Sequence, residues 1–304
     1  MSEDRILAEL VAMSRNLGDP SLDYAILGEG NSSARADAET FWVKASGVEM
    51  RTIGADGFVR VRFEPVLAML RAGEAPVARS IASLATTTGS PAQRKRPAHR
   101  KGSGTPQCAL AYPAGQAGTG YSAASDAEVK AGLEAARVDP RPETGRPSVE
   151  TVLHALALQM EGIHFVGHTH PTAVNAVLCS QKAEEAIAGR LFPDEIVYCG
   201  PAPLYIPYTD PGVPLAQAVG RAMADYQAQY GQAPKVILMQ NHGLIALGRT
   251  ALEVEQITAM YVKAFRVLLG AYALGGPHFM SPAAVARIHT RPDEQYRRSL
   301  WGKG

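Results

Sequence analysis

The sequence predicts a mixed α/β sandwich. Apolar residues recur with helical spacing in several stretches, and short apolar runs of strand length lie between them. Near the end of the chain, two such runs flank a polar tip with the sequence QNHG, which indicates a hairpin. No internal repeat accompanies this mixed order of elements.

The predicted helices follow from apolar periodicity and from residues suited to helix ends. Ile6, Leu7, Leu10, Val11 and Leu17 have helical spacing and predict a helix over residues 3–17. Other helices are predicted in the second part of 58–71, from Asp126, from Pro147 to about Met160, from Thr172 to Leu178, over 213–230 and, as the last one, over 251–271.

The predicted strands are short apolar runs bounded by polar or glycine-rich turns. The first two flank the polar turn GEGNSSAR, and the last two flank QNHG. In chain order the predicted strands are 24–27, 41–43, the start of 58–71, 163–166, 196–198, 204–206, 235–239 and 244–247.

Composition limits the class of protein. The chain has 304 residues, of which 46% are hydrophobic, and its formal net charge is +1. That balance provides no overall field for holding nucleic acid or an anionic membrane surface. No apolar run reaches about 18 residues, the N-terminus lacks a signal-peptide pattern, and the three cysteines do not suggest a disulfide framework. We therefore expect a soluble cytoplasmic enzyme with neither a nucleic-acid nor a membrane partner.

One segment departs from the average composition. Residues 79–125 contain no acidic residue and show no sustained periodicity, so they read as a flexible or anomalous insertion. A locally out-of-frame reading of the gene is the alternative explanation. Candidate site residues lie on both sides, at 31–47 and 148–242, so a single domain spanning 1–304 is expected. The short basic run at 94–101 lacks interleaved aromatic residues, which disfavours a nucleic-acid role.

Three histidines are candidate metal ligands. His168 and His170 follow the apolar run IHFV and, in extended backbone, point to the same face, where two imidazoles can chelate one ion. His242 lies at the QNHG tip, where Asn241 and Gly243 tolerate unusual backbone angles. The alternatives are a polar pair at a strand end and a turn-capping histidine.

Glu150 is a candidate fourth ligand or general base. It lies in the first turn of a predicted helix, where an acid is also favoured by the helix dipole alone. Partial burial beside a metal is expected to raise its pKa. His154 lies on the same helical face and is either a partner of the site or a core histidine.

Three polar turns are suited to hold an anion, although such turns are common. They are the stretch from Gly28 to Ser33, the turn Ala45-Ser46-Gly47 with Lys44 beside it, and Ser148 at a helix start. The chain has no P-loop pattern and no Rossmann fingerprint.

The segments GEGNSSAR, VKASG, PSVE, GHTHP and QNHGLIALG, in this order, resemble the class II aldolase/adducin family. The resemblance covers nearly the whole chain except about 79–125, and the longer spacing is similar to that of the rhamnulose-phosphate aldolase/dehydrogenase branch. It implies a three-layer α/β/α sandwich and a homotetramer with its site at subunit interfaces. It also implies a zinc cofactor, with manganese or cobalt as alternatives.

The resemblance assigns roles residue by residue. The zinc ligands fall on His168, His170 and His242, and the displaceable ligand and acid/base falls on Glu150. The phosphate-binding positions fall on Asn31, Ser46, Gly47 and Ser148. Tyr208 resembles the tyrosine that a neighbouring subunit supplies for proton transfer; the alternative is a turn residue. Val149 stands where the aldolases have a phosphate-binding serine, and Lys44 is suited to compensate or to bind a carboxylate.

The function implied is that of a metal-dependent lyase acting on a sugar, with a sugar phosphate favoured. A zinc-stabilised enediolate would support retro-aldol cleavage as the first choice. The same site would also support ribulose-phosphate 4-epimerisation, dehydration or decarboxylation. An adducin-like interaction protein without catalysis is the alternative from another class.

Overall fold

The structure is a computed structural model that describes residues 2–72, 110–111, 126–139, 145–294 and 296. Within this part of the chain, one sheet of eight strands has the order β3-β2-β1-β5-β8-β7-β6-β4. The strands are β1 (Asn31–Arg35), β2 (Thr40–Lys44), β3 (Phe58–Arg62), β4 (Leu110–Ala111), β5 (Phe165–Thr169), β6 (Leu204–Ile206), β7 (Val236–Met239) and β8 (Gly243–Gly248).

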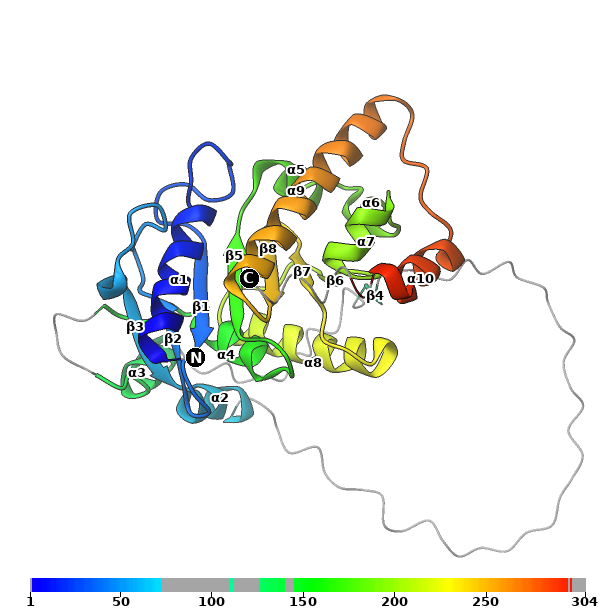
Figure 1. Cartoon of the computed structure of the whole chain (residues 1–304). Coiled ribbons are helices and arrows are strands. Elements are labelled where there is room, and N and C mark those ends of the chain that lie inside the picture. The colour runs from blue at the N-terminus through cyan, green and yellow to red at the C-terminus, as the bar shows by residue number, and fades with distance from the viewer. Residues whose placement is uncertain (1, 73–109, 112–125, 140–144, 295, 297–304) are drawn as a thin grey trace, which may run out of the picture.

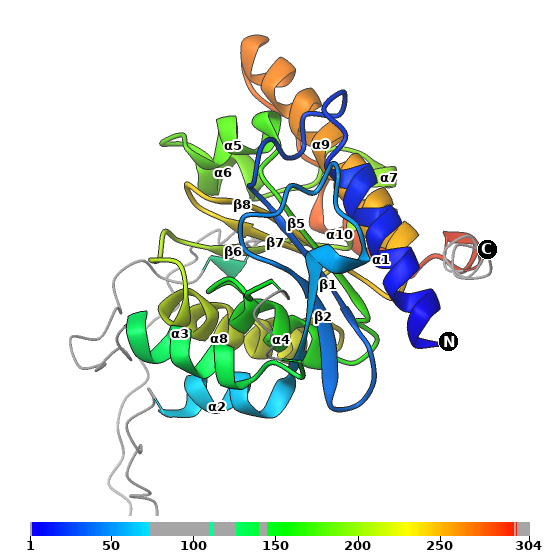
Figure 2. The same cartoon turned by 90° about the vertical axis from the view of Figure 1, so that its left-hand side faces the viewer.

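The helices cover both faces of this sheet (Figures 1 and 2). One layer contains α2 (Phe63–Ala72), α3 (Asp126–Ala135), α4 (Thr151–Gln159) and α8 (Val213–Tyr230). The other contains α1 (Glu3–Leu17), α5 (Thr172–Leu178), α6 (Ala183–Ile187), α7 (Pro193–Cys199), α9 (Ala251–Ala273) and α10 (Pro282–Thr290). Two separate clusters of buried apolar residues fill the space on either side of the sheet. The predicted three-layer α/β/α sandwich is confirmed.

The sheet is antiparallel from β3 to β7 and parallel from β7 to β4. β5 lies between β1 and β8, and its register pairs His168 with Asn31 on one side and with Ile245 on the other. Because directly paired residues are neighbours across a sheet, this register places the GEGNSS segment beside the HTH segment.

Local sequence explains how the longest helix begins. Thr250 caps α9 and accepts a hydrogen bond from the Glu253 backbone N–H at 3.1 Å, while the Glu253 carboxylate accepts from the Arg249 N–H at 2.8 Å. These bonds satisfy donors that a helix start otherwise leaves open. The α9 start thus holds the end of β8 in place.

Most predicted elements are present, and two predicted strands are wrong. Residues 24–27 lie in a loop with Leu27 at φ 53°, and the strand begins only at Asn31, inside the stretch predicted as a polar turn. Residues 196–198 belong to α7, which Pro193 opens. The helix predicted from Pro147 begins at Thr151, the strand predicted at 163–166 runs from Phe165 to Thr169, and α6 and α10 were not predicted.

The predicted insertion at 79–125 lies outside the described residues, apart from β4. No helix in the described ranges combines the length and the apolar character needed to cross a membrane.

Candidate metal and substrate site

His168 and His170 lie at the end of β5. His168 is fully buried between the neighbouring strands, and His170 follows the last strand residue. The His170 backbone N–H donates to the Tyr24 carbonyl at 2.8 Å, which fastens the chain after the strand to the loop before β1. Nε2 of His170 lies 3.0 Å from Nε2 of His168, so both rings present a nitrogen to one point.

His242 reaches the same point from the turn between β7 and β8. Asn241 adopts a left-handed conformation with φ 54°, and the Asn175 amide of α5 donates to the His242 carbonyl at 3.1 Å. The sequence predicts an unusual backbone angle at Gly243, but its φ is not positive. A glycine is needed here because there is no room for a side chain. A Cβ atom there would lie 2.6 Å from Cδ2 of His170 and from the Thr169 carbonyl oxygen.

The three imidazoles fit a divalent metal. Each of the three offers one nitrogen, and these atoms all lie within 4.8 Å of one another. Burial, with help from the neighbouring His168, lowers the pKa of His170 to about 4, so this ring is neutral near pH 7 and has a free lone pair. Three imidazole nitrogens that converge in this way are a donor set that zinc and similar metals prefer.

Glu150 completes the cluster. It occupies the position before the first residue of α4, with Oε1 3.2 Å from Nε2 of His242 and Oε2 3.4 Å from Nδ1 of His168. Burial alone would raise the pKa of the carboxyl, but His168 and His242 outweigh it and hold the pKa well below its ordinary value. The expectation of a raised pKa is therefore wrong for this arrangement of residues.

His154 lies behind the cluster in the core. It is completely buried, and its Nδ1 lies 2.7 Å from the Ser33 hydroxyl of β1. Burial lowers its pKa to about 3, and the nearby His168 contributes to the shift. His154 is thus a neutral core histidine that joins α4 to the sheet directly beneath the site.

The candidate anion-binding residues come together beside the histidines. The Asn31 amide donates to the Ser148 hydroxyl at 3.0 Å, although the two residues lie on either side of the acid-free segment. Ser46 is held in place because its N–H donates to the Arg146 carbonyl at 2.8 Å. Gly47 follows with φ 79°, a left-handed conformation that favours glycine.

Lys44 supports this turn from behind. Its ammonium group is buried and donates to the Val48 carbonyl at 2.7 Å and to the Ala45 carbonyl at 3.5 Å. Burial lowers its pKa, while the negative charge of Glu150 acts in the opposite direction. The lysine charge is thus placed under the Ser46–Gly47 turn, close enough to Glu150 to influence it.

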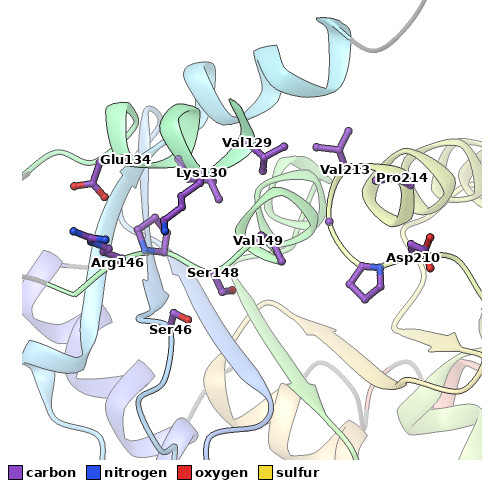
Figure 3. A pocket seen from close by; sticks show the side chains of 14 residues that line it. Ser46, Val129, Lys130, Glu134, Arg146, Ser148, Val149, Asp210, Val213 and Pro214 are labelled. Carbon is purple, nitrogen blue, oxygen red and sulfur yellow. The ribbon is translucent and has the colours of Figure 1, made fainter. Parts of the chain in front are cut away.

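A pocket of about 790 Å³ opens beside Ser46 and Ser148 (Figure 3). Lys130 of α3 and Arg146 lie on one side of it, Asp210 lies on the other, and Val149 forms part of the wall. Sequence reasoning did not single out Lys130 or Arg146. The position of Arg146 directly before the PSVE motif was a usable signal, whereas Lys130 reads as an ordinary exposed helix residue.

Tyr208 lies on the loop that follows β6, where its backbone N–H donates to the side-chain oxygen of Gln240, two residues before His242, at 3.0 Å. More than half of it is exposed, and its hydroxyl donates to Asp210 at 3.1 Å. This bond to a carboxylate raises the pKa of the Tyr208 hydroxyl.

The fold and this cluster define an α/β protein with a three-histidine centre suited to a metal. The family model described as "Class II Aldolase and Adducin N-terminal domain" matches residues 121–269, which include Glu150, the three histidines and Tyr208. The match covers 149 of the 304 residues and supports the family predicted from the motifs.

Solved structures share the fold. The N-terminal class II aldolase domain of a conserved protein from Thermoplasma acidophilum is 21% identical, with TM-score 0.54, covering 86% of this chain and 92% of that one. YgbL from Klebsiella pneumoniae, a putative aldolase/epimerase/decarboxylase, is 16% identical, with TM-score 0.57, covering 98% and 99%. L-fuculose 1-phosphate aldolase from Glaciozyma antarctica PI12 is 15% identical, with TM-score 0.54, covering 98% and 90%.

A curated relative matches over a shorter stretch. The uncharacterized oxidoreductase YuxG of Bacillus subtilis (strain 168) is 29% identical over 106 residues. This stretch amounts to 35% of the present chain and 13% of YuxG.

Proposed function

We propose that the protein is a metal-dependent carbon–carbon lyase that cleaves a sugar phosphate by a retro-aldol reaction. The observation that carries this proposal is the convergence of His168, His170 and His242 within 4.8 Å, with the Glu150 carboxylate against two of them. Zinc is the first choice of metal, with manganese or cobalt as alternatives.

A divalent cation held by the three imidazoles supplies Lewis-acid stabilisation of the charge that develops beside a carbonyl during carbon–carbon cleavage. In the cleavage direction Glu150 would deliver a proton to the carbon that the broken carbon–carbon bond leaves nucleophilic, and in the reverse direction it would remove that proton. The position of Glu150 suits this role because its two oxygens face different histidines and a fifth of its side chain is open to solvent. A carboxylate with a lowered pKa is ionised near pH 7 and is ready to accept a proton.

The anionic end of the substrate is proposed to bind at the Ser46–Gly47 turn and Ser148. Asn31 orients the Ser148 hydroxyl through their 3.0 Å hydrogen bond. Arg146 and Lys130 supply positive charge in the adjoining pocket. Charged donors of this kind bind phosphate or carboxylate oxygens more strongly than neutral ones do.

The assembly is proposed as a homotetramer in which Tyr208 serves the site of a neighbouring subunit. The exposure of Tyr208 supports this role, because more than half of the residue is open to contact with another subunit. We also propose that residues 1–304 form a single domain, because β1 to β3 and β5 to β8 share one sheet.

Epimerisation, dehydration and decarboxylation are second candidates, because each needs a stabilised carbanion-like intermediate. The description of YgbL as a putative aldolase/epimerase/decarboxylase supports keeping them. An adducin-like interaction protein is the candidate without catalysis; the complete set of Glu150 and three histidines argues against it.

The test is product analysis on a panel of phosphorylated and free ketoses and aldonates, with the protein loaded with zinc. Release of a two- or three-carbon fragment supports the lyase. A product that keeps all its carbons indicates epimerisation or dehydration, and loss of carbon dioxide indicates decarboxylation. Two results together support the interaction protein. The zinc-loaded protein would convert none of these compounds, and the protein purified under mild conditions would contain no divalent metal.

A further inference from the structure

A second carboxylate touches the histidine cluster from outside. Oε2 of Glu29 lies 3.2 Å from Nδ1 of His170, the ring nitrogen on the side away from His168. Oε1 of Glu29 accepts a hydrogen bond from the Ile26 backbone N–H at 2.7 Å, so both carboxylate oxygens have a partner. Glu29 is therefore held in one orientation against His170.

We propose that Glu29 is a positioning residue that fixes the tautomer of His170 for metal binding. An ionised carboxylate only accepts hydrogen bonds, so the Nδ1 atom facing it must carry the proton. Nε2 of His170 is then left with its lone pair, and this is the atom that lies 3.0 Å from Nε2 of His168. The inference rests on the metal site of the proposed function.

The loop that carries Glu29 is built to bring it to this place. Gly30 has φ 72°, and a Cβ atom there would lie 2.8 Å from the His168 carbonyl oxygen, so only glycine allows the loop to approach β5 this closely. A separate contact fastens the same loop to the start of α5, because the Thr172 hydroxyl donates to Asp23 at 3.0 Å.

Glu29 differs in part from Glu150, whose Oε2 atom also lies 3.4 Å from an outward ring nitrogen, Nδ1 of His168. Glu150 lies on the cluster side of His242, where its carboxylate meets the nitrogen that would face a metal. Glu29 meets the nitrogen of His170 that points out of the cluster. Carboxylates in this outer position orient a ligating histidine and raise its basicity, and their loss typically weakens metal affinity about 10- to 100-fold.

The test compares Glu29→Gln and Glu29→Ala with Thr172→Val in the full-length protein. The control removes a different contact between the same loop and the segment after β5, and it leaves the ring of His170 untouched. The dissociation constants for Zn²⁺ and Co²⁺ are measured by competition with a chromophoric chelator. We expect both Glu29 variants to bind about 10- to 100-fold more weakly than wild type, and the control to stay within about twofold of it, since it keeps the carboxylate–imidazole contact.

Long-range nitrogen–proton NMR spectra of ¹⁵N-histidine-labelled protein, recorded without added metal, give a second readout. We expect His170 of wild type to carry its proton on Nδ1. In Glu29→Gln, the amide oxygen that accepts from Ile26 leaves the NH₂ group facing His170, so the proton should move to Nε2. The control Thr172→Val keeps the Glu29 carboxylate against His170, so its spectrum should still place the proton on Nδ1.

The possible results distinguish the role of Glu29 from the existence of the metal site. Equal metal affinity in wild type and both Glu29 variants overturns the positioning role alone, as does an equal loss in Thr172→Val. Wild-type protein that binds neither metal overturns the metal site and, with it, the role of Glu29.

Discussion

The carboxylate of Glu150 lies 3.2 Å from Nε2 of His242, although one residue precedes a helix and the other sits at the tip of a hairpin. The same carboxylate lies 3.4 Å from Nδ1 of His168. These contacts join α4, β5 and the β7–β8 turn at one point. An acid held this way is suited to act at the metal centre.

Replacement of Glu150 by Gln should separate catalysis from metal binding. The three histidines remain, so the variant should keep its metal. Loss of the base should lower kcat about 10²- to 10⁴-fold. Steady-state kinetics and metal analysis of the same preparation check both expectations. Glu161→Gln, an exposed acid beyond the other end of α4, is the matched control and should leave kcat unchanged.

Val149→Ser should strengthen the binding of phosphorylated substrates. Val149 is exposed in the wall of the pocket, next to Ser148, where an added hydroxyl can reach a phosphate oxygen. One new hydrogen bond contributes about 0.5–1.5 kcal/mol, so KM should fall roughly 2- to 10-fold. Val149→Ala shortens the side chain without adding a donor. An equal fall in KM for that variant would contradict the hydroxyl explanation.

Arg146→Gln should weaken the binding of anionic substrates. Its side chain lines the pocket on the side of Ser46, and loss of a charged donor there should raise KM about tenfold. The KM of an uncharged sugar should not change. Arg71→Gln removes an exposed charge on α2 that pairs with Glu64 instead, and should have no effect. Equal losses for charged and uncharged substrates would show that Arg146 supports the loop and not the anion.

His154 predicts how stability depends on pH. Its pKa is lowered by burial from 6.5 to about 3 in the folded protein, so protons bind the unfolded chain more readily. The contribution of His154 to the free energy of unfolding is therefore at its maximum above about pH 6.5. It decreases as the pH falls from there towards 3, by up to about 1.4 kcal/mol per pH unit, because the unfolded chain binds the proton and the folded chain does not.

The check for His154 is a urea titration at fixed protein concentration between pH 7 and pH 5. The midpoint of wild type should fall more steeply than that of His154→Gln, which cannot titrate. His278→Gln, at an exposed histidine, should follow wild type. A His154→Gln midpoint that falls as steeply as that of wild type would show that His154 does not bind its proton on unfolding.

The elements with strong periodicity could be predicted from the sequence. The helices over 3–17 and 213–230 and the strand at 204–206 have the predicted bounds. For the polar segment Asn31-Ser32-Ser33 the sequence predicts a turn, because nothing local signals burial. It becomes a central strand because the flanking strands β2 and β5 pair with it, and its hydroxyls find partners such as His154 and Ser14.

Some residues of the candidate site could likewise be predicted from the sequence, and others could not. The histidines and Glu150 could be named from the sequence because their residue types and motifs indicate metal chemistry. The contact of Glu29 with His170 depends on the close approach of two segments at Gly30, which no local pattern reveals. The place of Arg146 and Lys130 in one pocket likewise follows only from the packing of α3.

Metal analysis of purified wild type and His242→Ala tests the central claim most directly. After loading with Zn²⁺ and removal of free metal, wild type should hold one metal ion per chain, and His242→Ala should hold almost none and lack lyase activity. Stoichiometric zinc retained by His242→Ala would contradict the three-histidine centre.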